Sequence, residues 1–146
     1  MFKFKLQSVL DYRLNIEEKI LNEFSELKRE LDRQKAMLEE LKSERESMVA
    51  GLRNMQSQTI KAHDISSILV YVDRLRESEK QQNQVILQTI EAVDQKRQEL
   101  VEAVKNRKIM ENLKDKQKEE YIKDVNDTEQ KDSDEMSVLK FGGREK

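Results

Sequence analysis

Side chains that could perform catalysis or bind a metal are scarce in this sequence. It contains no cysteine and one histidine, His63, and a lone histidine lacks the partners that a metal site or a general base requires. The carboxylate pairs Glu17-Glu18 and Glu39-Glu40 stand among other polar residues, with nothing to bury them as acid–base catalysis would require. No glycine-rich phosphate loop is present. We therefore predict a protein that is not an enzyme, with no catalytic residue, no metal and no cofactor.

The composition indicates which kind of structure carries the remaining residues. Charged residues make up 40% of the 146 and hydrophobic residues 36%, whereas a globular domain is nearer a quarter charged and about half apolar. Proline is absent, and residues that favour helices, such as Glu, Lys, Gln and Leu, dominate. This bias predicts long helices with a narrow apolar stripe rather than a compact globule or a disordered chain.

Charge and hydropathy bear on location and on partners. The net charge of −2 provides no field that would attract nucleic acid or an anionic membrane. No apolar run follows Lys3 and Lys5, as it would in a signal peptide, and the longest run, Ile68–Val72, is far too short to span a membrane. We expect a soluble, cytoplasmic protein with no nucleic-acid partner and no direct membrane insertion.

An apolar repeat with alternating steps of four and three residues runs through the first part of the chain. Its mean step of 3.5 residues is the period of a left-handed coiled coil. Eleven of its fifteen positions are apolar: Leu6, Leu10, Arg13, Glu17, Ile20, Phe24, Leu27, Leu31, Gln34, Leu38, Leu41, Arg45, Met48, Leu52 and Met55. We predict a helix over about 6–56, in which Gly51 is a tolerated interior residue.

The repeat fails at about 57–64, where we predict a turn with Asp64 as the N-cap of a new helix. That second helix is predicted over about 65–131, with a frayed tail at 132–146. Its apolar seam includes Ile65, Ile68, Val72, Leu75, Ile86, Val93, Leu100, Ala103 and Met110. Polar residues interrupt the seam at Glu79, Gln82, Thr89, Lys96 and Arg107. Such polar layers weaken a coiled coil and help to fix its register.

Two long helices joined by a short connection most simply fold back on each other, so that each covers the apolar stripe of the other. The alternative is one continuous helix in a parallel dimer. The break at 57–64 and the asymmetric polar layers favour the hairpin. The predicted fold class is therefore all-α, a single antiparallel coiled-coil hairpin over residues 1–146.

The start of the second helix is unusually apolar. Its apolar residues wrap most of the helix circumference: Ile65, Ile68, Leu69, Val70, Tyr71, Val72 and Leu75. A two-helix seam needs only about two positions in seven. The cluster therefore predicts an exposed patch that docks a partner, and Tyr71 and Leu75 are assigned to it; a locally wider core is the alternative.

Basic residues concentrate in the second half of the second helix. Between Lys96 and Lys123 there are nine basic and six acidic residues, and the stretch 124–135 then turns acidic. A solvated helix face is one interpretation, and electrostatic guidance of an acidic protein partner is the other.

Both ends of the chain resemble a known family. Phe2-x-Phe4-x-Leu6, followed by Val9-Leu10, Arg13 and Glu17-Glu18, resembles the opening of the FliJ family of flagellar export proteins. The other end is similar to theirs in Arg107, Glu111, Leu113, Lys114 and Lys116 before Tyr121, then Glu129, Lys131, Asp134-Glu135 and Phe141. The alternating phenylalanines and the Asp-Glu pair are the more specific elements, and the resemblance covers nearly the whole chain.

This resemblance implies an antiparallel two-helix coiled coil, similar to the stalk of rotary ATPases and peripherally associated with the membrane-bound export apparatus. The implied partners are the flagellar export ATPase hexamer, the cytoplasmic domain of the export gate, and export chaperones that the protein helps to recycle. The family's gate-binding surface aligns with Leu41, Met48, Tyr71 and Leu75, although family members can carry an aromatic residue in place of Met48. We further expect Arg13, Lys105, Arg107 and Lys108 to contribute to ATPase docking through complementary charge. A coiled-coil spacer or scaffold, or an injectisome stalk protein, is the alternative function.

Overall fold

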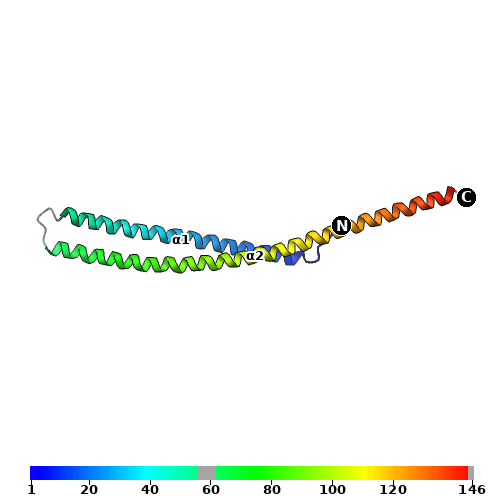
Figure 1. The fold of residues 1–146 in the computed structure, drawn as a ribbon. Coiled ribbons are helices and arrows are strands. Elements are labelled where there is room, and N and C mark those ends of the chain that lie inside the picture. The colour runs from blue at the N-terminus through cyan, green and yellow to red at the C-terminus, as the bar shows by residue number, and fades with distance from the viewer. Residues whose placement is uncertain (56–61, 145–146) are drawn as a thin grey trace. The chain divides into compact units, whose positions relative to one another are not determined.

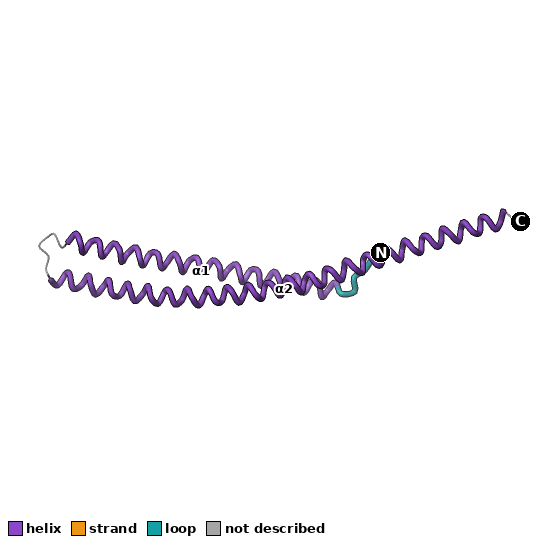
Figure 2. The backbone as a smooth tube through the Cα atoms, in the orientation of Figure 1, coloured by secondary structure: helices purple, strands orange, loops and turns teal. Residues whose placement is uncertain are grey.

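The structure is a computed structural model that describes residues 1–55 and 62–144. Two helices account for nearly all of it, α1 (Gln7–Met55) and α2 (Ala62–Arg144). They run side by side in opposite directions (Figure 1). No strand occurs within the described ranges, as the tube in Figure 2 shows. The predicted all-α hairpin is therefore confirmed.

The chain forms two compact units, and each contains a part of both helices. The loop unit comprises Lys19–Leu100, and the terminal unit combines Met1–Glu18 with Val101–Lys146. In each unit, a segment of α1 packs on a segment of α2, because neither apolar stripe is covered within its own helix.

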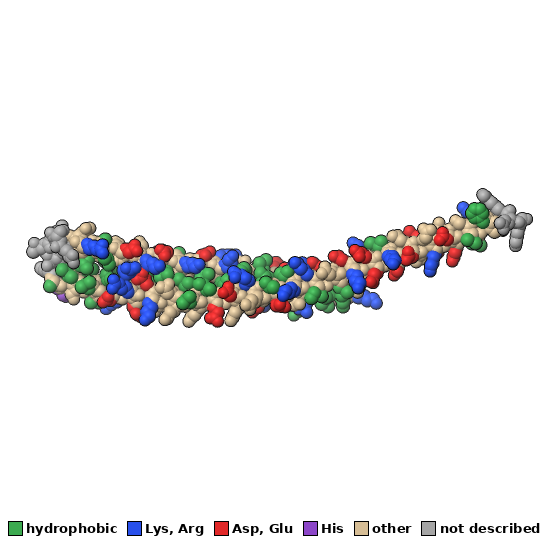
Figure 3. All heavy atoms as spheres, in the orientation of Figure 1, with side chains coloured by type: hydrophobic (Ala, Val, Ile, Leu, Met, Phe, Trp, Pro, Cys, Tyr) green, Lys and Arg blue, Asp and Glu red, His purple; other side chains and the backbone are tan. Residues whose placement is uncertain are grey.

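The core of both units follows the seam that the repeat of 3.5 residues predicts. Its buried apolar side chains in the loop unit are Leu38, Val72, Leu75, Ile86 and Val93. Those of the terminal unit are Leu10 and Ala103, together with Phe4, which precedes the predicted repeat, whereas Leu6, the first position of the repeat, is 40% exposed. Charged side chains cover much of the remaining surface (Figure 3), as expected for a core only two positions in seven wide.

Helix α1 begins just after an anchored aromatic residue and ends beyond a glycine. The Phe4 side chain is buried, and the Phe4 carbonyl accepts a hydrogen bond from the Gln7 N–H at 3.1 Å. The helix passes through Gly51, where no heavy atom lies within 4 Å of the position that a Cβ would occupy. Gly51 is therefore an interior helical glycine, as predicted, with no packing requirement of its own.

Two predicted boundaries need correction, both in the second helix. Residues 57–61 of the predicted turn lie outside the described residues, but Ala62 to Asp64 are already helical. Asp64 therefore lies in the first turn of α2 rather than at its N-cap, where its carboxylate still favours the positive end of the helix dipole.

The predicted frayed tail is wrong, because α2 continues to Arg144. No proline interrupts residues 132–144, and side chains one turn apart support the helix, as in the hydrogen bond from Gln130 Nε2 to Asp134 Oδ1 at 3.2 Å. Within the described ranges, neither helix has a stretch long and apolar enough to cross a membrane.

Candidate protein-binding surfaces

The predicted patch at the start of α2 divides into a buried half and an exposed half. Val72 and Leu75 are buried, and Leu75 is only 6% exposed. The assignment of Leu75 to an exposed patch is therefore wrong. The steps of four and three from Ile68 through Val72 to Leu75 carry the seam, so Leu75 faces α1. Leu69, Val70 and Tyr71 are the exposed members of the cluster, and Ile65 and Ile68 are partly exposed.

Tyr71 lies at the edge of the seam and is fixed there by α1. Its hydroxyl donates a hydrogen bond to Glu44 Oε1, while 37% of the residue remains exposed. This hydrogen bond, with some help from burial and from the charge of Glu44, raises the pKa of Tyr71 above its usual value. The ring is thus held at a defined place on the surface, which lowers the entropy that a partner would need to remove on binding.

The contact with Glu44 brings Tyr71 beside two other predicted gate residues. Leu41 and Met48 are seven residues apart on α1 and share one face, and Glu44 lies between them. Both are partly exposed. The hydrogen bond to Glu44 therefore ties Tyr71 to the side of α1 that carries Leu41 and Met48, and we call these three residues the Tyr71 surface. Leu75 lies beneath it as a core residue.

Polar seam positions of one helix meet polar seam positions of the other in the loop unit. Arg45 Nε donates to Glu79 Oε2 at 2.8 Å, and Glu79 is buried. Gln82 Nε2 donates to the backbone carbonyl of Gln34 at 2.9 Å. These contacts satisfy polar groups that would otherwise be buried alone, so the polar layers are matched in this register.

A further cluster of charged residues surrounds Phe24 in the loop unit. Lys96 Nζ reaches Glu23 at 2.7 Å and Glu99 at 2.8 Å, and these hydrogen bonds raise the pKa of Lys96. The hydrogen bond from Lys96 in turn lowers the pKa of Glu23. Lys28 and Arg97 lie over the Phe24 ring at 5.5 and 5.7 Å from its centroid. This cluster crosses between the helices and leaves little of its charge free for a partner.

The basic residues predicted to dock an ATPase do not form one surface in the terminal unit. Arg107 lies in the seam, where it donates to Glu17 and, at 2.8 Å, to Glu111. These hydrogen bonds raise its pKa and occupy its guanidinium. Arg13 is partly buried, whereas Lys105 and Lys108 are exposed and three residues apart on one outer face of α2. The two lysines are exposed to solvent, and Lys105 also forms an ion pair with Glu102 at 3.6 Å.

The N-terminal segment contacts α2 at the end of the region in which the two helices of the terminal unit are paired. Lys114 Nζ donates to Gln7 Oε1 at 2.8 Å, and the N-terminal amine donates to the Tyr121 hydroxyl at 2.8 Å. The Phe2 ring lies 5.7 Å from the Tyr121 ring, centroid to centroid. Beyond Tyr121, every residue of α2 from 122 to 142 is exposed. Sequence reasoning predicted the helix only to about residue 131 and treated 132–146 as frayed, so it missed the remainder of this uncovered helix.

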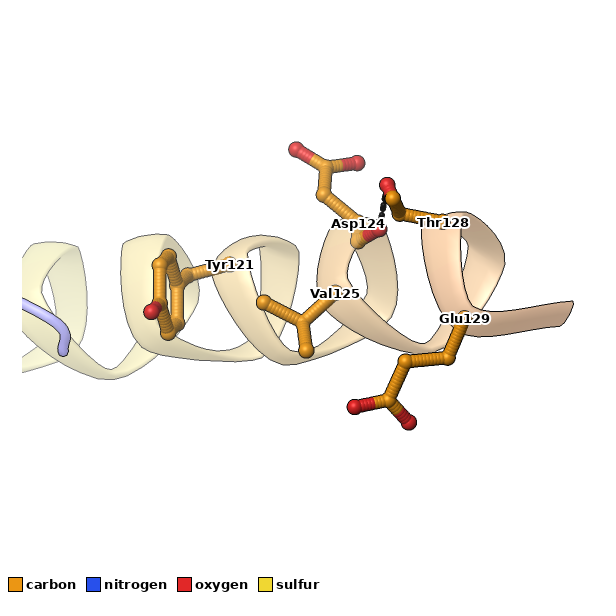
Figure 4. A pocket seen from close by; sticks show the side chains of 5 residues that line it. All are labelled: Tyr121, Asp124, Val125, Thr128 and Glu129. Atoms are coloured by element: carbon orange, nitrogen blue, oxygen red, sulfur yellow. Dashed lines mark hydrogen bonds between the residues drawn. The ribbon is translucent and has the colours of Figure 1, made fainter. Parts of the chain in front are cut away.

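Two shallow hollows lie along that uncovered part of α2, and neither encloses space for a small molecule. One is lined by Tyr121, Asp124, Val125, Thr128 and Glu129 (Figure 4). The other is lined by Asp134, Glu135, Val138 and Leu139. Within the described ranges, no group of three or more His, Cys, Asp or Glu side chains could hold a metal ion, and His63 is exposed in the first turn of α2.

Comparison with known proteins identifies one family. The family model described as Flagellar FliJ protein matches residues 2–146. No curated protein and no solved structure gives a significant match to the chain.

Proposed function

The chain belongs to the FliJ family of flagellar proteins, and from this we propose that it links the export ATPase ring to the export gate and assists export-chaperone recycling. The family is a non-enzymatic component of the flagellar export apparatus. The observation that carries the proposal is the family match, which extends over nearly the whole chain rather than over a generic coiled-coil segment.

We assign gate binding to the Tyr71 surface of the loop unit. Support comes from the partly exposed Leu41 and Met48 and from Tyr71, whose ring is held against α1 by Glu44. Aromatic anchors of this kind often carry much of the binding energy of an interface. Leu75 supports the surface from within the core rather than by contact with the gate.

We assign ATPase docking to the exposed lysines of the terminal unit, Lys105 and Lys108, with Arg13 at the margin. Exposed charges of one sign steer association with a partner of the opposite sign and act mainly on its rate. Arg107 contributes indirectly in this scheme, because its bond to Glu17 joins α1 to α2 and its bond to Glu111 fixes its side chain along α2.

The gate assignment is tested by titrating the isolated cytoplasmic domain of the export gate with single variants. Tyr71→Ala is expected to weaken binding by about tenfold or more, the loss typical of an interface anchor. Val70→Ala is the matched control, because Val70 is also exposed but projects to a different side of α2. Equal losses for both variants would contradict the assignment.

The ATPase assignment is tested by the association rate with the purified export ATPase. Lys105→Glu/Lys108→Glu is expected to slow association, with the largest effect at low salt. Arg74→Glu/Lys80→Glu makes the same change in net charge at exposed positions of the loop unit and serves as control. Unchanged association of the first variant at low salt would argue against docking through these lysines.

A further inference from the structure

Helix α2 carries a second line of residues outside the seam that faces α1. The line begins at Val101 and ends at Leu139, with alternating steps of three and four residues, so its members share one side of the helix. We call it the outer stripe, and it lies entirely in the terminal unit. Its apolar members occur at the start (Val101 and Val104), in the middle (Ile122 and Val125) and at the end (Met136 and Leu139).

Most of the outer stripe has no cover within its own chain. Val101 is 47% exposed and Leu139 is 72% exposed, and the residues from 122 to 142 all face solvent. Figure 4 shows two members of the stripe, Val125 and Glu129, on the part of α2 that follows Tyr121. A single exposed helix is marginal in water, and helices in proteins are stabilised mainly by packing of an apolar face. A partner is therefore expected along this stripe.

The two ends of the outer stripe are complementary to each other when the direction is reversed. If two copies of α2 pair in opposite directions, Val101 and Val104 of one copy meet Leu139 and Met136 of the other. In the same register, Lys108 meets Asp132. Pairing in the same direction would instead place Lys108 against Lys108, and like charges directly opposed are unfavourable.

The charge along α2 supports the same arrangement. The basic stretch that includes Lys105 and Lys108 precedes Tyr121, and the acidic stretch 124–135 follows it. Antiparallel pairing sets the acidic stretch of one copy along the basic stretch of the other. Three contacts in the middle of this register are less favourable, because Glu111 meets Glu129, Asp115 meets Val125 and Lys118 meets Ile122. Glu111 is already neutralised by Arg107 at 2.8 Å.

We propose that two copies of this chain associate through the outer stripe of α2 as an antiparallel, twofold-symmetric dimer. Such an interface is self-complementary, so it closes as a dimer and does not propagate into a filament. The proposal concerns the isolated chain and no other protein, but its interface includes Lys108, which is also assigned to ATPase docking, so the two surfaces overlap at this residue.

Disulfide formation between introduced cysteines tests the direction of pairing. The chain contains no cysteine, so the single variants Val101→Cys and Leu139→Cys report only on these positions. In an equal mixture under mild oxidation, the disulfide between the two variants should form well above the statistical proportion. Excess disulfides between identical variants would indicate parallel pairing, and a statistical mixture would indicate chance collision; either result overturns the proposal.

Sedimentation of the full chain over a range of concentrations tests the residues of the interface. Lys108→Asp and Asp132→Lys should each raise the dissociation constant of the dimer about tenfold, and the double variant Lys108→Asp/Asp132→Lys should restore it. Leu139→Asp should weaken the dimer strongly, whereas Phe141→Asp, on another side of the same helical turn, should not. A monomer at all concentrations, or equal effects of the last two variants, overturns the proposal.

Discussion

Leu75 and Leu69 offer a direct test of which side of the apolar cluster at the start of α2 is core. Leu75 is 6% exposed and Leu69 is 48% exposed, although they are the same residue type in the same helix. Leu75→Ala removes three buried carbon atoms at about 0.8 kcal/mol each, which gives a loss of about 2.5 kcal/mol in the free energy of unfolding. Any residual cavity adds to this value, and collapse of the narrow two-helix core reduces it. Leu69→Ala should change stability by no more than about 0.5 kcal/mol.

The measurement is urea unfolding of both variants, followed by far-ultraviolet circular dichroism. Leu75→Ala should lower the urea midpoint with little change in the slope of the transition, since the same surface becomes exposed on unfolding. The midpoint of Leu69→Ala should stay close to that of the wild type. Equal shifts for the two variants, or a larger shift for Leu69→Ala, would refute the position of the seam that places Leu75 in the core.

Three further predictions concern local features of the loop unit. Gly51→Ala should raise the free energy of unfolding by about 0.5–1 kcal/mol in urea unfolding, because Gly51 is helical and a Cβ there meets nothing within 4 Å. Gln34→Leu should raise the free energy of unfolding by about 1 kcal/mol, because it removes a buried side-chain oxygen that has no partner among the described residues. The backbone carbonyl that accepts a hydrogen bond from Gln82 is kept, and a lower free energy of unfolding would contradict this account. Glu44→Gln should lower the pKa of Tyr71, measured by alkaline titration of a variant whose only tyrosine is Tyr71. Because the pKa is raised, the Tyr71–Glu44 contact stabilises the fold at pH values below the usual tyrosine pKa of 10.0, and this stabilisation is lost as the pH rises through the folded-state pKa. An unchanged pKa of Tyr71 in Glu44→Gln would contradict the contact.

The seam and its polar layers could be read from the sequence because periodicity reflects which side of a helix is buried. Arg45 and Glu17 fall on the repeat of the first helix, and Glu79 and Arg107 fall on that of the second. The structure pairs Arg45 with Glu79 and Glu17 with Arg107. Charge and spacing were therefore enough to locate these residues, although the sequence did not show which partner each would meet.

The exposed surface was harder to predict, since it depends on positions next to the seam. Counting apolar residues around Tyr71 indicated that some must be exposed, but the count did not separate Leu75 from Leu69. The contact between Tyr71 and Glu44 depends on how the two helices are aligned, which no local pattern in either helix specifies. The helix beyond residue 131 was missed for a different reason, because the end of the chain was treated as frayed although its residues are acceptable helix formers.

Alignment of the two helices links the polar layers to the proposed binding surface. A slip of seven residues would keep apolar positions facing each other and would leave most of the seam intact. It would, however, place Arg45 opposite Val72 or Ile86, and Glu79 opposite Leu38 or Leu52. A buried charge that loses its partner costs about 3–5 kcal/mol, and this penalty applies to Glu79, whereas Arg45 is partly exposed.

The same slip would also separate the parts of the Tyr71 surface. Glu44 immediately precedes Arg45, so the register that pairs Arg45 with Glu79 also sets Glu44 against Tyr71. A coiled coil held only by apolar contacts could shift by a heptad and carry Tyr71 about 10 Å along α1, away from Leu41 and Met48. The charged layer weakens the core relative to an all-leucine seam, but it excludes the shifted pairings. In this chain, the residues that make the core less apolar are therefore the ones that keep a surface built from two helices in a single arrangement.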